Sequence, residues 1–485
     1  MSVTGLVLIL YMLGLLGVGM WASRRAATQE DFLLGGRSLG PVVAGLAYAA
    51  STSSAWVLLG FTGFVATVGV SALWMVPGIL AGYAAVWLWM GPFLQRTSRE
   101  RGFLTALDFV AADTGTAARP IKLIAAAMIV FCFSFYIAAQ FQGAGAALAE
   151  AFPIDERTAV IVGAGIILLY TLLGGFWAVS ITDTLQGLSI LLIAVTMPAA
   201  AFIVAGGVSG IGAAIASQSP AFAAPLGVHA GWSAFGFVVG IAAIGSGALG
   251  QPHLLTWIMA VKDDAARRQG AAVAIAWGAL VYAGMSVIAL SARALAEPGA
   301  SLGETIVFDM AGRVLPGVFP ALVSAAILSA IMSTVDAQLL VASATASHDL
   351  GVARIAPGRE VLVTRVAILA LCGLAVALTL YLPSSIFSRV LFAWTALGAA
   401  FGPTIVARVS GRRPHGAAIL AAMTCGFGVA VLFNQFLPSG PGAWRERILP
   451  WVVGLAIVFI FSKAAGRAGD GRPLAAGAKQ EVIGA

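Results

Sequence analysis

Residues 49–63 read AASTSSAWVLLGFTG and residues 245–253 read GSGALGQPH, and each stretch interrupts a long apolar helix. Glycine loosens a helix, and Pro252 both lacks a backbone N–H donor and clashes with the preceding turn. Backbone groups freed in this way are tolerated inside a bilayer only where they line a cavity within the protein. The two stretches therefore indicate a buried site, although small residues could also serve only to let helices pack closely.

The composition indicates that the helices around these stretches lie in a membrane. Of the 485 residues, 60% are hydrophobic and 10% are charged, and the mean hydropathy is +0.98. A soluble domain carries about 25% charged residues. The apolar runs predict an all-α membrane protein of about 13 transmembrane helices, most of them near the roughly 20 residues that cross a bilayer. The predicted spans are residues 3–23, 41–66, 70–94, 121–149, 157–174, 183–206, 233–259, 268–292, 315–347, 361–382, 385–408, 416–435 and 447–464.

The basic residues predict the orientation of these spans. Most of the 27 Lys and Arg residues fall in loops that face the cytoplasm if the N-terminus lies outside. The positive-inside rule therefore predicts a protein of the cytoplasmic (inner) membrane with its C-terminus inside. Because the basic residues form no single face, nucleic acid is not expected as a partner. We expect one transmembrane domain at residues 1–465 and a short, disordered cytoplasmic tail at residues 466–485.

The two interrupted helices are the second and the seventh predicted spans. Each opens a set of five spans, and an odd number of spans inverts the second set relative to the first. A matched pair of broken helices in inverted repeats indicates the midplane binding site of a secondary transporter. The sequence contains no nucleophile–base pair and no phosphate-binding loop, so we expect no enzyme activity and no catalytic residue.

The ninth predicted span carries polar residues where lipid-facing helices are apolar, namely Ser333, Thr334 and Asp336. A carboxylate costs at least about 2.5 kcal/mol in the bilayer, so Asp336 should face the protein interior. Hydroxyls together with freed carbonyls would supply the oxygen ligands that hard cations prefer. For Ser333 and Thr334 the alternative is hydrogen bonding back to their own helix. Asp183, at the start of the sixth span, could instead be an N-terminal helix cap.

Several motifs resemble those of the sodium:solute symporter family, most closely its sodium/proline symporter branch. The resemblance implies a LeuT-type fold with 5+5 inverted repeats. It also implies a sodium-coupled secondary active transporter that imports a small organic solute, proline or another small amino acid first. The matching motifs are LLGGRSLGP (33–41), AASTSSAWVLLGFTG (49–63), LTALDF (104–109), YTLLGGFWAVSITDTLQ (170–186), GQPHLL (250–255), SAAILSAIMSTVDAQLLVASA (324–344) and ALGAAFGP (396–403).

The resemblance also implies two binding sites, with Na⁺ as the coupling ion, no other metal and no cofactor. Its sodium site falls on Ala50, Ser53, Ala330, Ser333 and Thr334. Its substrate site falls on Ser54, Trp56, Gly60, Tyr136, Ile244, Ala248 and Gln251. Gln140 is one helical turn past Tyr136 and should share its face. The expected partners are a small solute, sodium and the lipid bilayer, with no obligate protein partner.

Three positions depart from the pattern of the proline branch. Proline symporters carry an aspartate where this chain has Thr52, and we therefore expect Asp183 and Asp336 to form a second cation site. They also carry a Trp and a Tyr in place of Ile244 and Ala248. The substrate pocket should then be either roomier or filled from another helix, and the candidates for filling it are Phe135, Phe141 and Trp257.

Four alternatives stay open at this stage. The two aspartates could couple transport to protons instead of sodium. The solute could be a short carboxylate or a pantothenate-like acid. The chain could also be a membrane solute receptor without net transport, or a channel.

Overall fold

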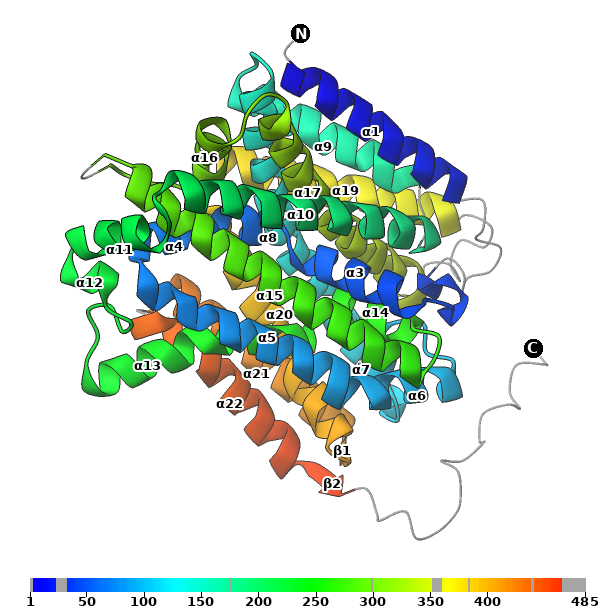
Figure 1. Cartoon of the computed structure of the whole chain (residues 1–485). Helices are drawn as coiled ribbons and strands as arrows, with labels where there is room; N and C mark the ends of the chain where they lie inside the picture. Colours follow the sequence, from blue (N-terminus) through cyan, green and yellow to red (C-terminus); the bar gives the residue numbers. More distant parts are fainter. Residues whose placement is uncertain are drawn as a thin grey trace.

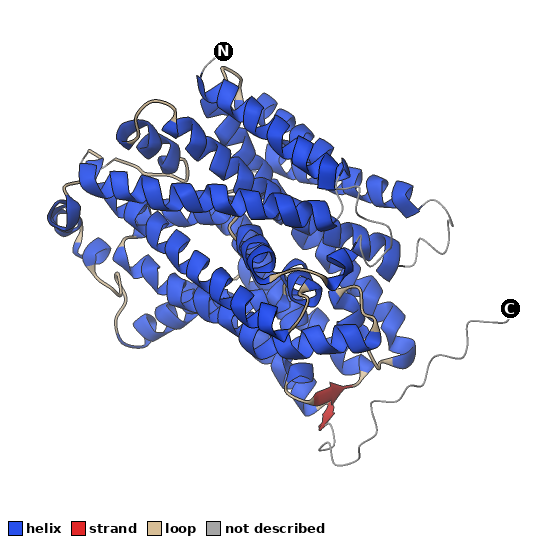
Figure 2. Ribbon diagram, turned by 45° about the vertical axis from the view of Figure 1, so that its right-hand side comes forward, coloured by secondary structure: helices blue, strands red, loops and turns tan. Residues whose placement is uncertain are grey.

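The apolar runs of the sequence form long helices that pack side by side in one bundle (Figures 1 and 2). The computed structural model describes residues 3–22, 33–173, 176–297, 300–350, 360–382, 384–437 and 440–464. The predicted tail at residues 466–485 lies outside the described residues. The elements in chain order are α1 (Val3–Ala22), η2 (Gly35–Arg37), α3 (Pro41–Thr52), η3 (Trp56–Phe61), α4 (Thr62–Val68), η4 (Val70–Trp74), α5 (Met75–Ala84), η5 (Ala85–Met90), α6 (Gly91–Arg101), α7 (Ala106–Ala111), η6 (Gly115–Ala117), α8 (Ala118–Ala151), α9 (Glu156–Leu173), α10 (Phe176–Val204), α11 (Gly207–Ser217), α12 (Pro220–Ala223), α13 (Gly231–Ala242), η7 (Ala243–Gly250), α14 (Pro252–Ala260), α15 (Asp264–Leu295), α16 (Ile306–Val314), α17 (Phe319–Ala344), η8 (Thr345–Asp349), α19 (Glu360–Tyr381), α20 (Ile386–Val409), β1 (Arg412–Pro414), α21 (Gly416–Gln435), η9 (Pro441–Ala443), α22 (Trp444–Ile460) and β2 (Ser462–Ala464).

Within the described residues, eight helical runs are long and apolar enough to cross a membrane, or nine if the bent pair α3 and η3–α4 is one span. A helix also lies in each of the other predicted segments. The number of thirteen crossings stays a prediction, and so does the orientation. We call the end of the bundle that carries α6 and α7 the α7 end, which is the predicted cytoplasmic side. The opposite end, which carries α11, α12 and α16, is the α16 end (Figure 1).

The structure differs from the sequence-based boundaries in two respects. The sixth span begins at Phe176 rather than at residue 183, because the mostly apolar residues 176–182 pack in the interior and continue the helix. Asp183 therefore lies inside α10, and its interpretation as an N-terminal cap is wrong. The described residues also contain one antiparallel strand pair, in which Arg412 faces Ala464 and Pro414 faces Ser462. This pair ties the end of α20 to the end of α22 and is the exception to an all-helical chain.

Both predicted helix breaks are present. In the second span, α3 ends at Thr52, Ser53 has the non-helical dihedrals φ −99° and ψ 65°, and the axis turns by 58°. In the seventh span, Gln251 is extended with φ −84° and ψ 110°. Pro252 then opens α14 at its first position, where a missing N–H costs no helical hydrogen bond.

The start of the first broken helix meets the end of the second one. The backbone N–H of Leu39 donates to the carbonyl of Ala260 at 3.2 Å, and the N–H of Lys262 donates to the carbonyl of Leu39 at 3.0 Å. This pairing is what inversion of the second five-span set relative to the first requires. The two breaks are thereby held at a similar depth in the bundle.

The helix that carries Asp336 is the most deeply buried span of the bundle. Its apolar stretch is wholly buried, and α17 packs against α1, α3, α8 and α10. Asp336 itself has no exposed surface, as expected for a carboxylate that avoids lipid. An apolar helix buried on every side shows no one-sided pattern in its sequence, so the polar residues of α17 are the features that mark its packing.

A cluster of charged side chains closes the α7 end. The Lys122 ammonium lies 2.5 Å from Asp108 and 3.1 Å from Asp349, and His348 lies 3.2 Å from Asp108. Thr105 caps α7 and donates to Asp349 at 2.9 Å. The cluster therefore ties α7 to the first turn of α8 and to η8, which continues the buried helix α17.

The pKa values of this cluster predict how the stability of the closed α7 end depends on pH. The hydrogen bond to Asp108 raises the pKa of His348, and burial raises the pKa of Asp349 to about 6. A group whose pKa is raised by folding stabilises the fold at low pH and loses that contribution as the pH rises through the raised value. Both groups therefore change in the same direction. The pKa of Asp108 is lowered by its partners, so its contribution is lost only in stronger acid.

We predict that the purified protein has a higher melting temperature than a His348→Gln, Asp349→Asn double variant, and that the difference between the two melting temperatures is largest at pH 5. The difference should shrink as the pH is raised to 8, since Asp349 loses its proton in that interval and His348 loses its own as the pH rises through its raised pKa. Differential scanning fluorimetry in detergent measures it. Asp309→Asn, an exposed carboxylate on α16, is the control and should keep the pH profile of the unaltered chain. A difference that grows with pH would contradict the prediction.

Candidate functional site

The break after α3 brings backbone carbonyls against the hydroxyls of α17. Ser333 Oγ donates to the carbonyl of Ala50 at 3.2 Å and to that of Ala330 at 3.1 Å. Thr334 Oγ1 donates to the carbonyl of Ser51 at 3.1 Å and to that of Ala330 at 2.9 Å. The hydroxyls thus contact both the other helix and their own. All of these residues are fully buried.

Four of the five residues predicted for the sodium site are therefore in mutual contact. The fifth, Ser53, lies in the break itself, and its backbone N–H donates to the carbonyls of Ala49 and Ala50 at 3.1 and 3.0 Å. Its hydroxyl is buried and has no hydrogen-bond partner among the described residues. The cluster is made only of carbonyl and hydroxyl oxygens, which is the ligand chemistry of a hard cation. A bound cation would require both α17 hydroxyls to turn their protons away from these carbonyls.

Two carboxylates lie buried next to this oxygen cluster. Asp336 accepts a short hydrogen bond from Thr171, while its second oxygen has no partner within the described part of the chain. The same holds for both oxygens of Asp183, which lies near Ser51 and is close enough to Asp336 for the two charges to interact. Gln186, one turn along α10, is also buried with an unpaired amide. Buried polar atoms without partners cost free energy unless an ion or a proton completes them.

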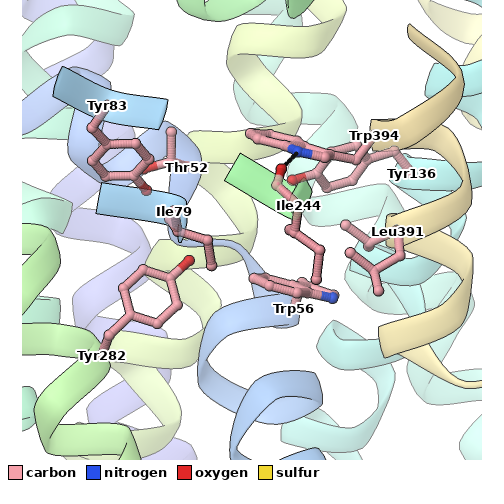
Figure 3. A pocket seen from close by; sticks show the side chains of 10 residues that line it. Thr52, Trp56, Ile79, Tyr83, Tyr136, Ile244, Tyr282, Leu391 and Trp394 are labelled. Carbon is pink, nitrogen blue, oxygen red and sulfur yellow. Dashed lines mark hydrogen bonds between the residues drawn. The ribbon is translucent and has the colours of Figure 1, made fainter. Parts of the chain in front are cut away.

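A small enclosed cavity lies beside the break in α3 (Figure 3). Its volume is about 20 Å³, which is room for about one water molecule. The rings of Tyr83 and Tyr282 lie on one side, those of Tyr136 and Trp394 on the other, and Trp56 closes it below, with Ile244 between them. The wall is formed by Thr52, Trp56, Ile79, Tyr83, Tyr136, Ile244, Tyr282, Val390, Leu391 and Trp394.

Three of the residues predicted to contact substrate line this cavity, namely Trp56, Tyr136 and Ile244. Two of the others, Gln140 and Ser54, bind backbone groups next to the first helix break. The Gln140 side chain accepts from the N–H of Ala55 at 2.9 Å, and the Ser54 hydroxyl accepts from the N–H of Trp56 at 3.1 Å.

Gly60, Ala248 and Gln251 also lie outside the cavity wall. A Cβ at Gly60 would lie 3.2 Å from the backbone of Phe387, so this glycine lets α20 approach η3. Gln251 bonds the carbonyls of Gly247 and Trp394 across the second break. Ala248 is buried in η7. Direct contact of these residues with a solute stays a prediction.

The residues that the sequence suggested for filling the pocket lie outside the cavity wall. Phe135 packs against Phe131 and Phe392, and Trp257 donates to Ser51 and packs against Phe176. Neither of them, nor Phe141, is part of the wall. Besides Trp56 and Tyr136, the aromatic rings of the wall come from Trp394 of α20, Tyr83 of α5 and Tyr282 of α15.

These three residues gave no recognisable pattern, because a single aromatic residue in an apolar span is more often core than ligand contact. A weak signal was available in composition. The chain has 7 tyrosines, and four of them are fully or almost fully buried together in the bundle: Tyr48, Tyr83, Tyr136 and Tyr282. A tyrosine hydroxyl inside a membrane protein needs a polar partner, so buried tyrosines in separate spans indicate a shared polar site.

The cavity is closed at both ends of the bundle. Toward the α16 end, the ring of Phe387 stacks on Trp56 at 5.6 Å and on Phe64 at 4.3 Å between ring centroids. Glu304 accepts from the backbone N–H groups of Ile386 and Phe387 at 2.9 and 2.7 Å, which fixes the start of α20. Toward the α7 end, α7 packs against α14, and a second cavity of about 20 Å³ lies there.

Comparison with known proteins agrees with this architecture. The model of the sodium:solute symporter family matches residues 32–426. The chain is 30% identical over 454 residues to the high-affinity proline transporter PutP of Bacillus subtilis (strain 168), which covers 92% of this chain and 94% of that protein. It is also 30% identical over 466 residues to the sodium/proline symporter of Escherichia coli (strain K12), which covers 93% and 91%.

Two solved structures show the same fold. A Na⁺-coupled sialic acid symporter in a substrate-bound outward-open state matches with a TM-score of 0.78 at 17% identity, over 96% of this chain and 99% of that one. MhsT in complex with L-phenylalanine matches with a TM-score of 0.55 at 14% identity, over 87% and 98%. The predicted LeuT-type fold is thereby confirmed, and the apolar helices make the chain an integral membrane protein. The chain belongs to the sodium:solute symporter family.

Proposed function

We propose that the chain imports proline, or a closely related small amino acid, in symport with sodium ions. The observation that carries this proposal is the contact between the hydroxyls of Ser333 and Thr334 and the carbonyls of Ala50 and Ser51. Relatives that cover almost the whole chain are named for proline transport. We further propose that the protein lies in the cytoplasmic membrane with its N-terminus outside, residues 1–465 forming the transport domain.

Sodium would be bound by oxygens of Ala50, Ser53, Ala330, Ser333 and Thr334. The solute would occupy an expanded form of the cavity beside Trp56 and Tyr136. Because the cavity is closed at both ends, binding and release each require one end to open, as in alternating access. A potential of −100 mV contributes about 2.3 kcal/mol for each positive charge that moves inward. No step of this cycle requires covalent chemistry or a cofactor.

We predict sodium-dependent, saturable uptake of radiolabelled L-proline into proteoliposomes under an inward sodium gradient. Choline replaces sodium in the control vesicles, and unlabelled amino acids, short carboxylates and pantothenate serve as competitors. Sodium-driven uptake of another solute, with no proline uptake, would refute proline and keep symport. If neither sodium nor a proton gradient drives uptake of any solute in the panel, symport itself is refuted and a receptor role takes its place.

The Thr334 hydroxyl offers a test of the cation site. We predict that Thr334→Ala raises the sodium concentration for half-maximal uptake by roughly tenfold, because one lost ligand to a charged group costs on the order of 1.5–3 kcal/mol. Thr424→Ala on α21 is the matched control, since its exposed hydroxyl bonds only its own helix. Equal sodium dependence in the two variants would contradict the assignment.

We also propose that Asp183 and Asp336 form a second cation site that supplies the negative charge Thr52 lacks. Three of their four carboxylate oxygens have no partner among the described residues. A cation between the two side chains would coordinate these oxygens and offset the repulsion between the two negative charges. Asp336→Ala should therefore raise the half-maximal sodium concentration by roughly tenfold. Thr52→Ala should change it less than about twofold, since its hydroxyl donates to the carbonyl of Ala49. Comparable effects of the two substitutions on sodium dependence would overturn this site.

The same pair of carboxylates favours proton coupling as the second candidate function. A proton shared between Asp183 and Asp336 would remove their repulsion as well as a cation would. Uptake driven by a pH gradient in sodium-free vesicles, and lost in Asp336→Asn, would support this candidate. Uptake that needs sodium at every pH would exclude it.

A further inference from the structure

Two carbonyls of η7, the element that precedes the second helix break, are bound by side-chain donors of the protein. The indole Nε1 of Trp394 donates to the carbonyl of Ile244 at 2.8 Å (Figure 3). Gln251 Nε2 donates to the carbonyl of Gly247 at 3.2 Å. A broken helix in a transporter commonly offers such carbonyls to its ligand or coupling ion. Here the two carbonyls each have a partner before any solute enters.

Close packing keeps the Trp394 indole over the break. A Cβ at Gly247 would lie 2.0 Å from its Nε1 atom, so the indole rests directly on the backbone of η7. One turn along α20, a Cβ at Gly398 would lie 2.7 Å from the Cα of Gly247. Gln251 also bonds the carbonyl of Trp394 at 2.9 Å. The indole therefore covers these carbonyls and cannot swing aside without separating the two helices.

The rest of the wall offers few free acceptors to a solute. None of its ten residues carries a charge. The hydroxyl of Tyr83 interacts with those of Thr52 and Tyr282, and the hydroxyl of Tyr136 interacts with that of Ser54. Besides these hydroxyls and the indole N–H of Trp56, which has no partner among the described residues, the wall consists of aliphatic side chains and the faces of aromatic rings, which surround the cavity on several sides (Figure 3).

These features select between kinds of ammonium group. A primary ammonium carries three N–H donors, a secondary ammonium two and a quaternary ammonium none. Each donor left unpaired in a buried site weakens binding. Aromatic faces attract a cation whatever the number of its N–H groups. A cavity rich in rings and poor in free acceptors therefore favours an alkylated ammonium.

We propose that Trp394 makes the central cavity selective for zwitterions with a secondary or quaternary ammonium over those with a primary one. The inference rests on the proposed function and names the substrate class of the same cavity. Trp394 acts as a specificity-determining residue because its indole N–H occupies the carbonyl that a primary ammonium would need. Proline, with a secondary ammonium, belongs to the favoured class, and so do N-methylated amino acids and betaines.

The matched pair L-alanine and N-methyl-L-alanine tests this proposal, since the two differ by one N-methyl group. N-Methyl-L-alanine should inhibit sodium-driven proline uptake at a roughly tenfold lower concentration, the effect of one unpaired donor. In parallel, each compound is tested for thermal stabilisation of the purified protein in sodium chloride. This second readout needs no transport, so a failure of symport and a failure of selectivity are distinguishable.

Trp394→Phe keeps an aromatic ring and removes the indole N–H, which frees the carbonyl of Ile244. The alanine to N-methylalanine ratio should fall from about tenfold to below about threefold, mainly because alanine binds better. Trp74→Phe removes an indole hydrogen bond to Pro225 near the α16 end and should keep the ratio.

A ratio near one in the unaltered protein overturns the proposal, and so does stabilisation by neither compound. Both of these outcomes are measured on the unaltered protein, so they decide the proposal even if Trp394→Phe does not fold. An unchanged ratio in a folded Trp394→Phe variant, judged by size-exclusion chromatography, removes the role from Trp394.

Discussion

Backbone groups inside a bilayer must find partners within the protein, and the two broken helices are where this constraint acts. At the first break the carbonyls of Ala50 and Ser51 face the hydroxyls of α17, because no water reaches them. At the second break the carbonyl of Ile244 takes the indole N–H of Trp394. The arrangement of α17 and α20 against the breaks follows from this need. At the proposed cation site some buried polar atoms lack a hydrogen-bond partner. At the solute cavity a ligand could take the place of the partners that are present.

Burial of α17 explains why polar residues gather on that helix. A helix packed on every side can carry Ser333, Thr334 and Asp336 without exposing any of them to lipid. Protein partners offset only part of the free-energy cost of burying the carboxylate. One oxygen of Asp336 accepts from Thr171, and the other has no partner among the described residues. A buried charge of this kind is unfavourable unless a cation or a proton accompanies it. The unpaired oxygens thus indicate that Asp336 binds a ligand, whereas an aspartate with all its hydrogen bonds made would indicate a structural role.

The sequence predicted the features that follow from local chemistry. Glycine, serine and Pro252 located both breaks, and the polar residues of α17 identified the helix that faces the first one. It could not predict the wall of the cavity, because Tyr83, Tyr282 and Trp394 come from three spans whose contacts depend on the packing of the whole bundle. The start of α10 was misplaced for a related reason: residues 176–182 could belong to a loop or a helix, and tertiary packing decides. Phe135 and Trp257 are large enough to fill the pocket, but their side chains pack against other residues and do not line the cavity.

The short segment at residues 50–56 contributes to both the proposed cation site and the cavity, so a change at one site is expected to affect the other. Ala50 and Ser51 offer carbonyls to α17, while Thr52 and Trp56, a few residues on, line the cavity. A cation that pulls on the first two carbonyls must also shift the backbone that positions the next residues, because Ser53 is bonded to Ala49 and Ala50 and transmits their position. Trp56 in turn stacks on Phe387, which closes the α16 end. Cation binding, cavity shape and closure of that end therefore depend on a single non-helical turn, and a cation that binds one arrangement of this turn more tightly shifts the population of all three.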